Sequence, residues 1–251
     1  MPQAFVARAI VRALCTLPAY PSLRVLDLSC GKGEIIAELS RDGCEVRGTH
    51  FRSDDYKLHD APQTLHDDLA IDPDIDLLKP LPYDPASFDV VILSEVLEHL
   101  FTCIPVIAEA GRILRPGGHL VLTTPNIARL HSRLYFFLTG THKLIRRRVG
   151  WDIRPDQLYA YHVNPVDFPL LHTLLFQAGL RVERLEFTRF KRRHAWLLLL
   201  FPLFWLCARL ETRRRVAPGR QREGEDDLFR WMMHPAMLAS EQLLVIATKL
   251  R

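Results

Sequence analysis

Asp27, Gly31 and Gly33 form an acid-x-x-x-Gly-x-Gly pattern, the clearest chemical signal in the chain. Glycine has no side chain, so a ligand can approach bare backbone here, and the free N–H groups of a following helix can face it. The Asp27 carboxylate can hold a cationic or amine-bearing ligand. The pattern excludes a dinucleotide fingerprint, because Ile36 replaces the third glycine, and a phosphate loop, because Gly33 follows Lys32.

A second group is Glu95-x-x-Glu98-His99, with His162 as a later histidine. If the first three residues lie on one helix, Glu95 and His99 share a face. His99, oriented by Glu95, can then act as a general base, because an imidazole pKa near 6.5 suits proton removal at neutral pH. The alternatives are a divalent metal held with His162, and a structural role in which His99 packs the helix and Glu98 is exposed. We favour catalytic roles for Glu95, His99 and His162 and assign no metal.

Alternating strands and helices must position these groups. Residues 25–28, 87–94 and 119–124 are continuous apolar runs, typical of strands buried on both faces. Further strands are predicted over residues 44–49, 71–75, 180–187 and 243–248, and helices over residues 34–41, 104–114, 127–139 and 166–178. This alternation indicates an α/β fold with a mostly parallel sheet and helices on both faces.

Four further segments carry a family resemblance: FDVV (88–91), EVLEHL (95–100), LRPGG (114–118) and TPN (124–126). With the glycine turn they resemble class I methyltransferases that use S-adenosyl-L-methionine (SAM). The nearest branch includes ubiquinone-pathway O-methyltransferases and enzymes of bacterial surface-glycan clusters. The resemblance is specific over residues 25–126 and weak beyond Gly179. It implies a single Rossmann-like domain over residues 1–251, an antiparallel last strand, and SAM as the cofactor.

The resemblance also assigns cofactor contacts. Asp27 matches the acid that holds the amino end of the methionine moiety. The family usually carries an acid for the ribose hydroxyls after the second strand; here His50 stands there, with one acceptor nitrogen instead of two oxygens, and the aspartates at 54 and 55 are substitutes. Asp76 best matches the adenine-side acid, with Asp68 as the runner-up. The predicted cofactor contacts are Asp27, Ser29, Gly31, Gly33, His50, Asp76, Leu77 and Ser94.

Composition limits the class and location of the protein. With 251 residues and 48% hydrophobic content, the chain can bury one sizeable core. Its five cysteines form no C-x-x-C pair, which favours a reducing, cytoplasmic compartment over a disulfide framework. Residues 1–20 lack the apolar run of a signal peptide. They are predicted as an amphipathic helix on the sheet edge, with Arg8 and Arg12 on its outer face.

Trp196 to Leu206 is an almost wholly apolar segment flanked by basic residues. Residues 181–220 carry 11 Lys or Arg against 3 Asp or Glu, whereas the whole chain has a net charge of only +4. Such a basic patch indicates an acidic partner surface, either lipid headgroups or nucleic acid.

The same segment is too short to cross a bilayer. A helix over residues 195–208 would span about 21 Å of the roughly 30 Å hydrocarbon core, and Pro202 interrupts it. Two interpretations remain. The first is a helical hairpin packed on the domain. The second is a peripheral anchor with arginines on headgroups and four aromatic residues in the lipid interface: Trp196, Phe201, Phe204 and Trp205. A second subunit is the alternative partner.

Two insertions are therefore predicted in addition to the α/β core. Residues 127–165 are predicted as a lid or acceptor-binding insertion, and residues 191–240 as the basic-flanked apolar helical insertion. The candidate acceptor contacts in the first are Trp151, Arg154, Tyr159 and Tyr161.

Three functions fit the sequence. The first is a SAM-dependent O-methyltransferase that acts on a small-molecule, lipid- or glycan-linked acceptor at the cytoplasmic face of a membrane. The second is an RNA 2′-O-methyltransferase, because Glu95-x-x-Glu98-His99 with His162 resembles the metal site of small-RNA methyltransferases and residues 146–148 are basic. The third is a non-catalytic methyltransferase-like scaffold, supported by His50. Nucleic acid ranks below the lipid or glycan acceptor, and the oligomeric state stays open.

Overall fold

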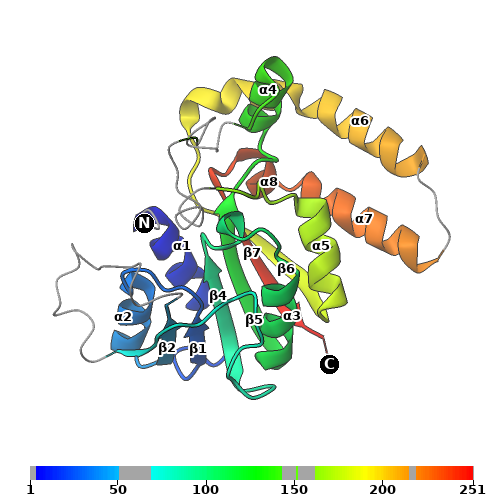
Figure 1. Ribbon diagram of the computed structural model, residues 1–251. Helices are drawn as coiled ribbons and strands as arrows, with labels where there is room; N and C mark the ends of the chain where they lie inside the picture. Colours follow the sequence, from blue (N-terminus) through cyan, green and yellow to red (C-terminus); the bar gives the residue numbers. More distant parts are fainter. Residues whose placement is uncertain (1–3, 51–68, 143–150, 152–161, 215–218, 251) are drawn as a thin grey trace.

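The computed structural model describes residues 4–50, 69–142, 151, 162–214 and 219–250, and it contains one seven-stranded sheet (Figure 1). The strand order is β3-β2-β1-β4-β5-β7-β6, and only β7 runs antiparallel to its neighbours. The strands are β1 (Arg24–Asp27), β2 (Glu45–Thr49), β3 (Ala70–Asp72), β4 (Phe88–Ser94), β5 (Leu114–Pro125), β6 (Leu180–Phe187) and β7 (Gln242–Lys249). The predicted Rossmann-like sheet with an antiparallel last strand is confirmed.

Helices cover both faces of the sheet (Figure 1). On one face lie α1 (Ala4–Leu14) and α2 (Glu34–Arg41), whose apolar side chains pack with Val90 and Ile92 of β4. On the other lie α3 (Ile104–Ile113) and α5 (Phe168–Gln177). The central strands are therefore buried on both sides, which is why they are continuous apolar runs.

The N-terminal helix packs on one face of the sheet. Val6, Ile10 and Leu14 of α1 are fully buried in the same cluster as Val121 of β5 and Ile246 of β7. The helix also reaches the edge strand β6, where the Arg12 guanidinium donates to the Phe187 carbonyl at 3.3 Å. Arg8 and Arg12 point outward as the amphipathic pattern predicts.

The strand β5 begins at Leu114, earlier than the predicted strand over residues 119–124, so Pro116-Gly117-Gly118 is part of it. Phe88 pairs with Leu114, and the register shifts before Val90 pairs with His119. Gly117 takes a positive φ of 76°, and a side chain at Gly118 would meet the carbonyl oxygen of Asp89 at 2.9 Å. Glycines at these two positions let the strand bend and continue.

The two insertions pack together beyond the carboxyl ends of the strands (Figure 1). The first contains α4 (Leu130–Thr139), and the second contains the 3-10 helix η4 (Arg192–Leu200), α6 (Phe201–Arg214), α7 (Arg220–Met232) and α8 (Pro235–Ala239). A small cluster of Leu130, Leu197 and Leu238 joins them.

Residues 195–208 do not form one helix, as the interruption at Pro202 predicts: the 3-10 helix η4 ends at Leu200, and α6 begins at Phe201. Pro202 is the second residue of α6, where a missing N–H costs nothing. The hairpin interpretation is confirmed in part, because α6 packs on α7: Arg209 pairs with Asp226 at 3.1 Å, and the ring of Trp205 meets that of Phe229 edge-on. However, no side chain of α6 is fully buried.

Candidate functional site

Asp27, the last residue of β1, is a buried carboxylate that a bound cation would stabilise. It is 1% exposed, and neither carboxylate oxygen has a hydrogen-bond partner in the described part of the chain. Burial raises the pKa of this carboxyl from 3.8 to about 8. A buried carboxylate without a partner is costly, so an ammonium group placed against it would relieve that cost.

The glycine turn beside Asp27 leaves its backbone open. Gly31 has a φ of 58°, and a Cβ built on it would meet no atom within 4 Å. Gly33, with a φ of 73°, is the N-cap of α2. The turn is fixed from behind, because the Ser29 N–H donates to the Thr49 hydroxyl at 2.9 Å. A carboxylate, an open cradle and a helix start thus fit the methionine end of SAM, which carries an ammonium and a carboxylate.

His50 follows β2 at the adjacent strand end. Its main chain is held on both sides: its N–H donates to the Asp72 carbonyl at 3.0 Å, and its carbonyl accepts from Ile75 at 2.8 Å. His50 is half-buried and directly follows β2. Its contact with the ribose stays a prediction. The predicted substitutes Asp54 and Asp55, and the runner-up Asp68, lie outside the described residues.

The two predicted adenine-side residues, Asp76 and Leu77, differ in their side-chain contacts. Asp76 accepts from the Leu78 N–H at 3.0 Å and lies 3.5 Å from the Lys79 ammonium, so it stabilises its own turn. Leu77 packs its side chain in the core, which leaves its main chain as the part that can face a ligand. Their cofactor roles stay predictions.

The predicted helix carrying Glu95 and His99 does not exist. Glu95 has a φ of 55° directly after β4, and only Leu97–His99 form a short 3-10 helix, η2. Ser94 and Glu95 are held to β5 instead: the Ser94 and Thr123 hydroxyls are 3.3 Å apart, and the Glu95 N–H donates to the Thr123 carbonyl at 3.0 Å. Thus Glu95 and His99 do not share a helix face.

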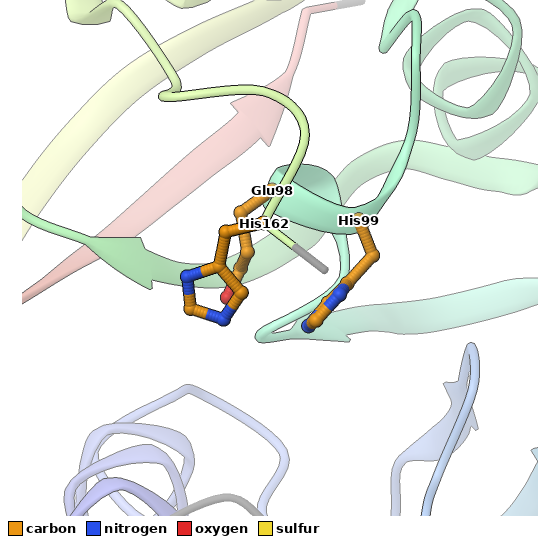
Figure 2. A group of neighbouring side chains, drawn as sticks. All are labelled: Glu98, His99 and His162. Atoms are coloured by element: carbon orange, nitrogen blue, oxygen red, sulfur yellow. The ribbon is translucent and has the colours of Figure 1, made fainter. Parts of the chain in front are cut away.

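Glu98, His99 and His162 form a compact cluster (Figure 2). One ligand atom from each lies within 4.8 Å of the others, and the two imidazole centroids are 4.8 Å apart. Figure 2 shows all three side chains directed to the same side. The expectation of an exposed Glu98 is wrong, since it is 2% exposed. The Thr124 hydroxyl donates to its Oε2 at 3.2 Å, and the Asn164 N–H donates to its carbonyl at 3.1 Å.

A small pocket opens beside this cluster. Its lining comes from η2, from the end of β5, from residues on either side of α4 and from the segment before α5. The lining residues include Glu98, Thr124, Ile127, His142, His162 and Asn164. Such a pocket can hold an acceptor with its hydroxyl near two imidazoles and a carboxylate; we name it the acceptor pocket.

The cluster allows two kinds of chemistry. A carboxylate and two imidazoles form a common donor set for a divalent transition metal. Without a metal, an imidazole beside a carboxylate can take a proton from a hydroxyl. Sequence reasoning ranked Glu95 above Glu98, although the Glu-x-x-Glu-His spacing contained both. The proximity of Glu98 to His162 is what distinguishes it from Glu95 as the carboxylate of this cluster.

Comparisons with known proteins agree with this arrangement. A family described as "Methyltransferase domain" matches residues 3–185. This chain belongs to the SAM-dependent methyltransferases. The family, its cofactor and the enzyme class predicted from the sequence are thereby confirmed. Within the described residues, no helix is long and apolar enough to cross a membrane.

Two curated relatives are ubiquinone biosynthesis O-methyltransferases. That of Xanthomonas campestris is 32% identical over 111 residues, which covers 43% of this chain and 45% of the relative. That of Nitrosococcus oceani is 29% identical over 168 residues, covering 64% and 65%. The chain thus matches less than two thirds of the length of these relatives.

Solved structures share the fold at low identity. A SAM-dependent methyltransferase from Archaeoglobus fulgidus superposes with a TM-score of 0.58 at 18% identity, over 98% of this chain and 94% of that one. One from Mesorhizobium loti gives 0.52 at 19% identity, over 96% of each chain. At such identities the likeness establishes the fold alone.

Of the four predicted acceptor contacts, the structure describes only Trp151. Trp151 is 97% exposed. Arg154, Tyr159, Tyr161 and the basic residues 146–148 lie outside the described residues.

Proposed function

We propose that this methyltransferase transfers a methyl group from SAM to a hydroxyl of a lipid- or glycan-linked acceptor at the cytoplasmic face of a membrane. The observation that carries the transferase part is the buried Asp27 carboxylate beside the open Gly31 turn. Asp27 and Ser94 end neighbouring strands, β1 and β4, so the glycine turn and the segment leading to Glu98 begin at the same edge of the sheet.

SAM supplies an electrophilic methyl group on a sulfonium, whose sulfur leaves with the electron pair of the broken C–S bond. The protein must align the acceptor oxygen with that methyl group and remove the hydroxyl proton. Alignment alone contributes on the order of 7–11 kcal/mol. His99 or His162 accepts the proton, with Glu98 stabilising the imidazolium that forms.

The membrane part is supported by exposed apolar side chains gathered on α4, η4 and α6. We call this set the apolar cap. Phe137 is 83% exposed and Leu199 82%. The cap consists of Phe136, Phe137, Leu138, Trp196, Leu198, Leu199, Leu203, Trp205, Leu206 and Leu210. Monomeric soluble proteins rarely expose so large an apolar set. The arginines within residues 181–220 add the positive charge that anionic headgroups attract.

Incubation with tritiated SAM and a membrane extract tests this function. Label should enter a lipid-soluble or polysaccharide product, and Gly31→Val should abolish it by filling the open cradle. The matched control is Gly43→Val, because Gly43 also has a positive φ and open space but lies at the other end of α2. Label confined to small soluble metabolites would contradict the membrane part.

A second candidate function is methylation of an RNA 2′-hydroxyl, which the Glu98–His99–His162 geometry favours. It predicts activity that a chelator removes and a divalent ion restores, together with RNA affinity that falls steeply with salt. Metal-independent labelling of a lipid would contradict it.

A non-catalytic scaffold is the third candidate, because His50 replaces the usual acid. The fold alone does not exclude it, because one fold can carry unrelated functions. Calorimetric titration with S-adenosylhomocysteine decides: absence of binding would leave only the scaffold.

A further inference from the structure

A second small pocket lies between α4, η4 and α8. It is lined by cations and apolar groups together. The charged or titratable lining residues are Arg129, His131, Lys191 and His194. Among the residues that the structure describes, no acidic one lines it. We name it the basic pocket.

Arg129 is the unusual member. Its residue surface is only 6% exposed, and its side chain makes one long hydrogen bond within the described residues, from Nε to the Ser132 hydroxyl at 3.4 Å. Burial lowers the pKa of this guanidinium. Most of its five N–H donors therefore remain available to an anion in the pocket.

Glu241 is the carboxylate that acts on Arg129 electrostatically, and it is already engaged. It pairs with Lys191 and lies 3.8 Å from the Arg189 guanidinium. Glu241 does not line the pocket. One carboxylate thus serves three cations, which leaves a net positive charge here.

Three further features favour an anion. Arg129 is the N-cap of α4, so the pocket also receives the positive end of a ten-residue helix. The rings of His131 and His194 stack with centroids 4.0 Å apart, and both line the pocket. Guanidinium, ammonium, imidazole and helix N–H groups converging on one space suit a tetrahedral oxyanion with several acceptor oxygens.

The basic pocket neighbours the acceptor pocket. Ile127 lines the acceptor pocket and Arg129 the basic pocket, so their Cα atoms are at most about 7.6 Å apart. On its other side the basic pocket meets the apolar cap, since Leu198 belongs to both. A molecule that spans the three regions would present a hydroxyl, an anionic group and an apolar tail in that order.

We propose that the basic pocket is a subsite for a phosphate group of the methyl acceptor, bound by Arg129, Lys191, His131 and His194. Its assignment to the acceptor rests on the proposed function, whereas the phosphate binding itself does not. The phosphate belongs either to an amphiphile, whose tail lies on the apolar cap, or to a water-soluble molecule.

Titration calorimetry with inorganic phosphate tests the site. Lys191→Met, at the rim, and Arg129→Gln should each weaken phosphate binding at least about tenfold, because each removes a charge-assisted contact. Arg189→Gln is the matched control: it removes the same charge and the same Glu241 contact outside the pocket, and should change affinity less than about twofold. Melting temperatures show whether Arg129→Gln folds; if it does not, Lys191→Met decides.

Two results would overturn the proposal: no phosphate binding by the natural protein, or equal losses in Lys191→Met and Arg189→Gln. The second result would mean that general surface charge, not the pocket, attracts the ion.

A monomeric short-chain phosphatidic acid separates the two sources of phosphate. If the phosphate belongs to an amphiphile, this lipid binds at least about tenfold more tightly than inorganic phosphate, and Leu199→Ser, in the apolar cap but outside the pocket lining, reduces the gain. Equal affinities assign the subsite to the phosphate of a water-soluble acceptor.

S-adenosylhomocysteine titration of the same proteins keeps the two proposals apart. Lys191→Met should bind it as the natural protein does. Phosphate binding without any S-adenosylhomocysteine binding would end the proposed function and leave the phosphate site standing.

Discussion

At the scale of single residues, Asp27 connects stability with cofactor binding. Its folded-state pKa of about 8 lies above the ordinary 3.8, so the folded protein holds this proton more tightly than the unfolded chain. The resulting stabilisation is complete below about pH 4 and is lost as pH rises to about 8. The whole effect is at most on the order of 5 kcal/mol.

We therefore expect Asp27→Asn to stabilise the ligand-free protein relative to the natural one at pH 8, but little at pH 4.5. Urea denaturation at both pH values measures this. Asp84→Asn, at an exposed aspartate, is the control and should show no such pH dependence. Equal pH dependence of Asp27→Asn and the natural protein would show that Asp27 ionises normally.

The same residue predicts proton release on ligand binding. An ammonium beside Asp27 lowers the pKa of the carboxyl, so S-adenosylhomocysteine should bind more tightly as pH rises from 6 to 7.5 and should release up to one proton. Calorimetry in two buffers of different ionisation enthalpy measures the release. Asp27→Asn should show none and bind at least about tenfold more weakly. Release that persists in this variant would assign the proton to another group.

A comparison of two carboxylates decides the catalytic role at the acceptor pocket. We expect Glu98→Gln to lower turnover about 10²-fold or more, because the buried carboxylate can no longer support His99 and His162 as base or as metal ligands. Glu95→Gln is the matched variant. Unchanged melting temperatures would exclude unfolding, and a larger loss in Glu95→Gln would return the role to the residue that sequence reasoning chose.

At the scale of elements, η4 and α6 carry the membrane hypothesis. Replacing Leu199 and Leu203 together by Glu should reduce cosedimentation with anionic vesicles at least about tenfold, because both side chains are exposed and belong to the apolar cap. The melting temperature should hardly change, since neither lies in the core. Leu170→Glu, on α5, alters an equally exposed leucine away from the cap and should bind as before. If it loses binding equally, the effect is not local to the cap.

At the scale of the whole molecule, the positive charge is concentrated in one stretch of the chain. Residues 181–220 carry a large excess of basic residues, and the whole chain has a net charge of only +4. The rest of the chain therefore has a net negative charge. This asymmetry would orient the protein at an anionic surface, with the apolar cap and the basic pocket toward the lipid.

Binding to anionic vesicles should accordingly weaken as salt rises from 0.05 to 0.5 M, because ions screen surface charges over roughly 4–14 Å in this range. Binding to zwitterionic vesicles should be weaker throughout and nearly independent of salt. Sedimentation at several salt concentrations measures both. Salt-independent binding to anionic vesicles would leave only the apolar contact.

The sequence by itself determined the sheet, the glycine turn and the place of Asp27, because these depend on neighbours in the chain: apolar strand runs, Gly-x-Gly, and the residue that ends a strand. Only the tertiary structure decided that Glu98 rather than Glu95 joins the two histidines, since 64 residues separate Glu98 from His162 and the positive φ of Glu95 breaks the expected helix. It likewise brought Arg129 to Lys191 and His194 across α4 and η4. Contacts between residues this far apart depend on how packed helices cross the strand ends, which no local spacing specifies.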